Sequence, residues 1–251
     1  MRSPSLASAG VTERAVIVSQ QKRGQAAIFS MVTEDGHLRQ GILPNRRLST
    51  MKGAGYLRPF SKVYITLWAK KQIGRELHYL QEIQQVDGIS VVSTLLDSLE
   101  NIAYTSIAGE LIHLLFSISE GERELFSRLE GYASAIDEKS TRIATIILGW
   151  QLLEIGGFVP RAEVLLSTGE EGSLVEAKQA FWKEVQWATG RVIPISEAFQ
   201  QGLGNILTYR WGEGKLSGSE SFWKEGEELL FSFSESALGE CLKSRSFLQT
   251  I

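Results

Sequence analysis

Short runs of apolar residues, many of them β-branched, recur through the first 85 residues, and in places apolar and polar residues alternate. The alternation is clearest where Val63, Ile65 and Leu67 face one way and the residues between them face the other. Such runs, separated by turns that contain glycine, are typical of short strands. The runs are residues 16–18, 27–32, 38–43, 63–68 and 77–83. Five short strands in this part of the chain predict a small Greek-key barrel such as the OB-fold.

From residue 89 to residue 158 the apolar residues instead recur at intervals of three and four, as on one face of a helix. Helices are predicted near 91–117, 120–135, 139–156, 174–189, 195–209 and 219–240, with a loop at 161–173. Gly156 and Gly157 are expected to end the third helix, and Pro160 blocks its continuation. We therefore predict an α+β protein, with a five-stranded barrel over residues 1–85 and a mostly helical domain over residues 86–251.

The two predicted domains carry opposite net charge. Residues 1–85 hold 13 basic and 5 acidic side chains, a net charge of +8, whereas residues 86–251 hold 13 basic and 24 acidic side chains, a net charge of −11. The 40 residues between Asp35 and Glu76 include nine Lys or Arg and no acidic residue. This asymmetry indicates a surface that binds a polyanion, and an ordinary solvated basic surface is the alternative.

Basic residues together with aromatic ones suit single-stranded nucleic acid, because phosphates attract cations and unpaired bases stack on aromatic rings. The candidate DNA-binding residues are Lys22, Arg23, Arg39, Arg46, Arg47, Lys52, Arg58, Lys62, Lys70 and Lys71. Tyr64 and Trp68 are the candidates for base stacking. The alternative for each aromatic residue is packing inside the barrel or against the helical domain.

Patterns of catalytic and metal sites are weak in this sequence. The one cysteine, Cys241, and the three histidines are too scattered for zinc-ligand spacing. No phosphate-binding glycine loop is present, and two SxxK matches lack the partner motifs of serine acyltransferases. We therefore predict no catalytic residue, no metal and no cofactor. The chain start lacks the apolar run of a signal peptide and no run is long enough to span a bilayer, so we expect a soluble cytoplasmic protein without a membrane segment.

Five segments are similar, in order along the chain, to motifs of the bacterial RecO recombination-mediator family. They are TEDGHL at 33–38, GILPNRR at 41–47, GYLRPFS at 55–61, LLEIGGFVP at 152–160 and LKSRSFL at 242–248. The resemblance implies an N-terminal OB-fold, a helical domain and no catalytic activity. It also implies binding of single- and double-stranded DNA, strand annealing, and a bacterial, nucleoid-associated location. The implied partners are RecR and the C-terminal tail of single-strand-binding protein, and the implied outcome is assistance to RecA in loading onto DNA.

The sequence departs from this family at the segment that follows residue 160. Many members carry four cysteines there as a zinc site, whereas residues 161–190 contain neither Cys nor His. We therefore expect a degenerate module without zinc.

Peptide binding is expected in the helical domain, because the resemblance supplies an acidic tail with an apolar end as a partner. The candidate residues lie around the loops that join predicted helices, and they are Arg123, Arg128, Lys139 and Arg142. Their alternative role is to pair with nearby glutamates on the helix surface. An alternative function for the whole protein is that of an interaction adaptor whose basic barrel binds an acidic protein tail.

Overall fold

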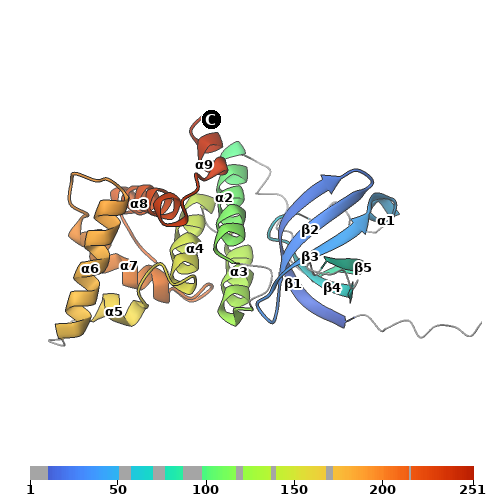
Figure 1. Cartoon of the computed structure of the whole chain (residues 1–251), viewed down its shortest axis with the longest axis horizontal. Helices are drawn as coiled ribbons and strands as arrows, with labels where there is room; N and C mark the ends of the chain where they lie inside the picture. Colours follow the sequence, from blue (N-terminus) through green and yellow to red (C-terminus); the bar gives the residue numbers. More distant parts are fainter. Residues whose placement is uncertain are drawn as a thin grey trace, which may run out of the picture. The chain divides into compact units, whose positions relative to one another are not determined.

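The computed structural model describes residues 11–50, 58–69, 77–86, 98–116, 121–136, 140–167, 172–214 and 216–251. Contacts between residues divide the chain into two compact units. The first unit is Met1–Val92 with Ser117–Ala133, and the second is Ser93–Phe116 with Ser134–Ile251. Figure 1 shows the strands of the first unit and the helices of the second, coloured along the sequence.

Five strands of the first unit close into a barrel in the order β1-β2-β3-β5-β4. They are β1 (Val11–Arg23), β2 (Ala26–Thr33), β3 (Leu38–Pro44), β4 (Lys62–Ala69) and β5 (Leu77–Gln85). Only β3 and β5 pair in parallel; the other neighbours are antiparallel. This arrangement confirms the predicted five-stranded, OB-like barrel. β1 is longer than its predicted run because its first half pairs with β4 and its second half with β2, with a register shift between Ile17 and Ser19.

Alternate residues of the strands fill the inside of the barrel. Phe29, Met31 and Ile65 are among the fully buried core side chains. Gly41 of β3 leaves room for the side chain of Leu80 on β5, since a Cβ atom there would lie 2.7 Å from the Cγ atom of Leu80. The apolar alternation seen in the sequence therefore corresponds to the inner face of this barrel.

Helix α3 (Arg123–Ala135) packs against the barrel within the first unit. The ring of Phe60 is fully buried and meets the ring of Tyr132 edge to face, with centroids 4.8 Å apart. Arg14 of β1 donates to the carboxylate of Glu130 at 3.0 Å and lies over the ring of Phe126. The boundary predicted at residue 85 stays a prediction, and it places α3 in a different domain from the barrel that it contacts.

The second unit contains seven described helices. They are α2 (Leu99–Leu115), α4 (Thr141–Ile155), α5 (Ala162–Leu166), α6 (Gly172–Ala188), α7 (Glu197–Thr208), α8 (Glu220–Leu238) and α9 (Lys243–Leu248). α4 is buried along almost its whole length and contacts α2, α7 and α8 (Figure 1). At its centre Trp150 packs against Phe199 and Phe233, and Gly149 makes room for Leu230. A helix that is apolar over most of its circumference belongs at the centre of such a unit.

The predicted helices are found close to their expected positions, with three differences. Residues 91–97 of the first predicted helix lie outside the described residues, and α2 begins after Ser98, whose side chain accepts from the Asn101 amide at 3.0 Å. The loop predicted over 161–173 is wrong in part, because α5 forms there. Buried Glu154 stabilises its start by accepting from the Ala162 amide at 2.9 Å. The six-residue helices α1 (Asn45–Thr50) and α9 were not predicted, because a run this short shows no periodicity.

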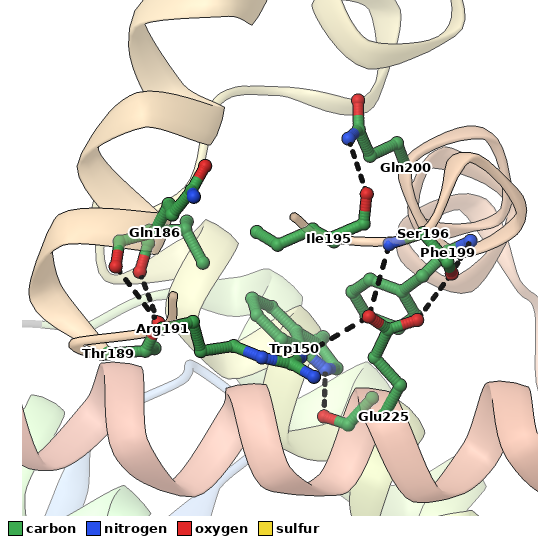
Figure 2. A network of polar contacts seen from close by, with 11 residues as sticks. Trp150, Gln186, Thr189, Arg191, Ile195, Ser196, Phe199, Gln200 and Glu225 are labelled. Carbon is green, nitrogen blue, oxygen red and sulfur yellow. Dashed lines mark hydrogen bonds and ion pairs between the residues drawn. The ribbon is translucent and has the colours of Figure 1, made fainter. Parts of the chain in front are cut away.

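A carboxylate of α8 holds the loop that joins α6 to α7 (Figure 2). Glu225 accepts from the backbone amide of Ser196 at 3.1 Å and from the guanidinium of Arg191 at 3.2 Å, and also from the hydroxyl of Ser196. The same hydroxyl accepts from the Phe199 amide at 3.2 Å and thereby caps the start of α7. Glu225 therefore links the loop, α7 and α8 in one network.

Candidate nucleic-acid interface

Four of the predicted DNA-binding residues lie at one end of the barrel, on the β1–β2 turn and on α1. All four side chains are exposed. Asn45, the first residue of α1, joins the two segments: its amide donates to the carbonyl of Gln25 at 2.9 Å, and its side chain donates to the carbonyl of Gly24 at 3.2 Å. Figure 1 shows α1 beside this hairpin. We call these four residues the basic end: Lys22, Arg23, Arg46 and Arg47.

Acidic side chains gather at the opposite end of β2. Glu34 and Asp35 follow β2 in the turn that leads to β3, and Glu13 lies near the start of β1. Glu34 pairs with Arg14 at 3.3 Å, and Asp35 pairs with Arg39 at 2.6 Å. Charge is therefore separated along the barrel, and the basic end has no described acidic residue in the two segments that form it.

Arg39 is paired with an acidic side chain of its own turn. A residue that binds phosphate instead needs its cation available to the ligand. Its guanidinium donates to Asp35 and, at 3.2 Å, to the hydroxyl of Thr33. Partial burial by itself raises the pKa of Asp35, but hydrogen bonds from Thr33, His37 and Arg39 outweigh it and hold this pKa well below its usual range. The Asp35 carboxylate therefore stays ionised at neutral pH, and its ion pair with Arg39 stabilises the β2–β3 turn.

The other predicted DNA-binding residues that the structure describes are not brought to the basic end. Arg58 and Lys62 are half-buried in and after the turn that precedes β4. Lys52, Lys70 and Lys71 lie outside the described residues. The structure therefore gathers four of the ten predicted residues into one surface.

A hollow of about 450 Å³ lies over β1, β2 and β3 on the outside of the barrel. It shares Arg23 with the basic end, and the other lining residues are Gln21, Ile28, Ser30 and Gln40. Gln21 is opposite Ile28, and Ser30 is opposite Gln40, so these side chains share one face of the sheet. In OB-folds this face and the adjoining loops bind oligonucleotides.

Sequence reasoning did not select the uncharged residues of this hollow, because neither a charge nor an aromatic ring marks them in the sequence. The signal was present in β2, where Ala27, Phe29 and Met31 are buried in the barrel. Their neighbours Ile28 and Ser30 must then face outward, since successive side chains of a strand point to opposite faces.

The predicted stacking residues lie apart from the hollow or cannot be placed. Tyr64 is exposed on β4, opposite Arg14 of β1 and Gln84 of β5. The backbone of Trp68 pairs with that of Tyr79, but the Trp68 side chain lies outside the described part of the structure. Tyr79, which the sequence analysis did not select, is exposed on β5 opposite Ile42 of β3.

The candidate peptide-binding residues are divided between the two units. Arg123 and Arg128 belong to the first unit, where Arg128 pairs with Glu124 at 2.8 Å. Arg142 belongs to the second unit and pairs with two carboxylates of α8. Burial by itself lowers the pKa of Arg142, but these carboxylates outweigh it and hold this pKa above its usual range. Lys139 lies outside the described residues. A shared peptide site for these residues stays a prediction.

Within the described part of the chain, no group of three or more His, Cys, Asp or Glu side chains is placed to hold a metal ion. The segment 161–190, in which a degenerate zinc module was expected, forms α5 and α6 in its described parts. None of the described helices combines the length and the apolar character that crossing a membrane requires.

Comparison with known families gives a match for the helical part of the chain. The sequence model of a family described as "Recombination protein O C terminal" matches residues 96–246. The match covers more than half of the chain and runs from the residues just before α2 into α9. No curated protein matches the sequence. The matched residues follow the barrel in the chain. The barrel is therefore evidence for the predicted OB-like fold that does not depend on this match.

Proposed function

Since the chain belongs to the recombination protein O family, we propose that it binds single- and double-stranded DNA through the basic end of its barrel. The family functions in DNA recombination and repair, and its members are in general not enzymes. The family predicted from the sequence motifs is thereby confirmed. The observation that carries DNA binding is the basic end itself, four exposed cations beside a hollow on the outer face of the barrel.

This surface suits a nucleic-acid backbone for a physical reason. Each Lys or Arg that neutralises a phosphate releases condensed counterions, and this release supplies most of the affinity that does not depend on sequence. Arg46 and Arg47 also offer planar guanidinium groups, which bind phosphate oxygens in a bidentate manner. Carboxylates at the same place would repel the backbone, and they lie at the other end of β2.

The proposed biological role follows from the family and from the resemblance of the sequence motifs. The protein promotes annealing of complementary strands and assists RecA in loading onto DNA covered by single-strand-binding protein. RecR and the C-terminal tail of single-strand-binding protein are its proposed partners, in the cytoplasm and on the nucleoid. Annealing requires that two polyanions approach each other, and a cationic surface reduces their mutual repulsion.

A second candidate function uses the same four cations. An acidic protein tail would also be attracted to the exposed Arg46 and Arg47, so the barrel would then serve as a protein-interaction module. DNA and an acidic peptide differ in that only DNA presents regularly spaced phosphates and unpaired bases. Direct comparison of the two ligands separates these functions.

The test is a double substitution, Arg46→Ala with Arg47→Ala, in the full chain. Its matched control is Lys183→Ala with Lys224→Ala, which removes the same charge from two exposed sites in the second unit. Binding of a labelled single-stranded oligonucleotide is measured by fluorescence anisotropy. Two lost phosphate contacts should weaken binding roughly 25-fold at about 0.1 M salt, taking about 0.7 log units for each contact.

The control variant should bind the oligonucleotide as the parent does. An equal loss in both variants would mean that net charge alone sets the affinity, and the basic end would not be the interface. Binding of an acidic peptide, with no binding of DNA, would establish the adaptor function in place of the proposed one.

A further inference from the structure

A row of outward-facing residues crosses the barrel from the hollow to an exposed aromatic ring. Gln21 of β1 is opposite Ile28 of β2, Ile28 is opposite Ile42 of β3, and Ile42 is opposite Tyr79 of β5. Residues that are directly opposite on neighbouring strands point to the same face of a sheet. The row is therefore one continuous strip of surface, and Tyr79 lies at its far end.

The burial of β5 supports this orientation of Tyr79. His78 and Leu80, its two neighbours in the chain, are buried, whereas Tyr79 is 41% exposed. Since side chains alternate along a strand, the ring of Tyr79 faces outward on the same side as Ile42.

The chemistry of the strip matches that of a nucleotide. Ile28 and Ile42 are half-buried and form an apolar floor, and Tyr79 adds an aromatic face. Gln21, which is exposed, and Gln40, which is half-buried, offer donors and acceptors of the kind that base edges bind. Arg23, at the start of the strip, provides a cation for phosphate.

We propose that Tyr79 stacks on an unpaired base of a DNA strand whose phosphates lie on the basic end. This inference rests on the proposed function, and it names the part of the site that distinguishes single strands from duplexes. In a duplex the faces of the bases are already stacked on one another, so only an unpaired base can offer a face to the ring. The basic end binds both kinds of DNA, and Tyr79 adds affinity for single strands alone.

Tyr64 provides a matched comparison on the neighbouring strand β4. It is 42% exposed, almost the same as Tyr79, but it lies four residues along β4 from the position that pairs with Tyr79. This separation is about 13 Å at roughly 3.3 Å for each residue. Its neighbour across β1 is Arg14, which pairs with Glu34 and Glu130, so a strand at Tyr64 would meet carboxylates.

The experiment compares Tyr79→Ala, Tyr79→Phe and Tyr64→Ala with the parent chain. Three labelled probes of equal length are used: oligothymidylate, the same backbone carrying abasic sites, and a duplex. Tyr79→Ala should weaken binding of oligothymidylate roughly 5- to 150-fold, which is the range for loss of one aromatic stacking contact. Its binding to the abasic strand and to the duplex should match that of the parent. Tyr79→Phe and Tyr64→Ala should bind all three probes as the parent does.

Two results would overturn the inference while the proposed function stands. One is a Tyr79→Ala variant that binds oligothymidylate as tightly as the parent. The other is a Tyr79→Ala variant that loses the same affinity for the abasic strand, because a stacking contact needs a base. Failure of the parent chain to bind any of the three probes would instead refute the proposed function, and this inference with it.

Discussion

Replacing Phe60 by glycine should destabilise the barrel less than replacing it by alanine, although glycine is normally the more disruptive of the two in a fixed structure. Phe60 has a φ angle of 64°, and among the described residues it is the one non-glycine residue with positive φ. A backbone hydrogen bond holds Phe60 in this conformation, since its amide donates to the carbonyl of Ile17 at 2.6 Å. Its ring is fully buried against Tyr132 of α3.

The magnitude follows from three contributions. Both substitutions remove the buried ring, which costs about 3–5 kcal/mol for Phe→Ala in a well-packed core. Alanine keeps a Cβ atom in the left-handed region, at a cost of about 1–2 kcal/mol that glycine avoids. Glycine in turn loses roughly 0.5–1 kcal/mol through the greater conformational entropy of its unfolded chain. The glycine variant should therefore be the more stable by about 0.5–1 kcal/mol.

The assay is urea titration of the full chain with hydrogen exchange of the β2 and β3 amides as readout, because the two compact units need not unfold together. Phe29 of β2 is the control: it is equally buried in the barrel and its φ angle is not among the positive ones. There the glycine variant should be the less stable. The same order at Phe60 as at Phe29 would refute the left-handed conformation of Phe60.

Three further predictions concern stability. Asp35→Asn should destabilise the first unit at neutral pH, and the difference in urea midpoint from the parent should shrink as the pH falls below 3.8, because the folded-state pKa of Asp35 is depressed and its contribution is lost on protonation. A constant difference down to acid pH would contradict this. Gly36→Ala should unfold at lower urea than Gly24→Ala: both glycines have positive φ, but only at Gly36 would a Cβ atom lie 2.2 Å from the Glu122 backbone. Equal midpoints would contradict that contact. Glu225→Gln should cost roughly 1–3 kcal/mol and increase hydrogen exchange in α7, since hydrogen bonds to a charged group are lost; unchanged exchange would show that the network is dispensable.

The barrel and most helices were predictable because burial imposes a period on the sequence. Strand residues such as Ile65 alternate with exposed ones, and the helix that contains Trp150 is apolar over most of its circumference. Short elements were not predictable: α1, α5 and α9 span five or six residues, too few for a helical period. The position of α3 was also hidden, because its contacts with Phe60 and Arg14 join segments far apart in the chain.

The candidate site was predictable in its charge and not in its shape. The acid-free stretch indicated a basic barrel, yet only a fold shows that the β1–β2 turn and α1 meet through Asn45. It also shows that Arg39 is held by Asp35. For the aromatic residues, sequence reasoning selected Tyr64, whereas the pairing of β3 with β5 places Tyr79 on the face of the hollow. That pairing is parallel and non-local, so no local pattern reveals it.

The dependence of single-strand affinity on salt tests the central claim most directly. If all four residues of the basic end contact phosphates, the logarithm of the binding constant should fall with the logarithm of salt concentration with a slope of about −2.8, taking about −0.7 for each contact. The Arg46→Ala, Arg47→Ala double variant should give a slope of about −1.4, and the Lys183→Ala, Lys224→Ala control should keep the slope of the parent. A parent slope near zero, or a double variant whose slope equals that of the parent, would contradict DNA binding at the basic end.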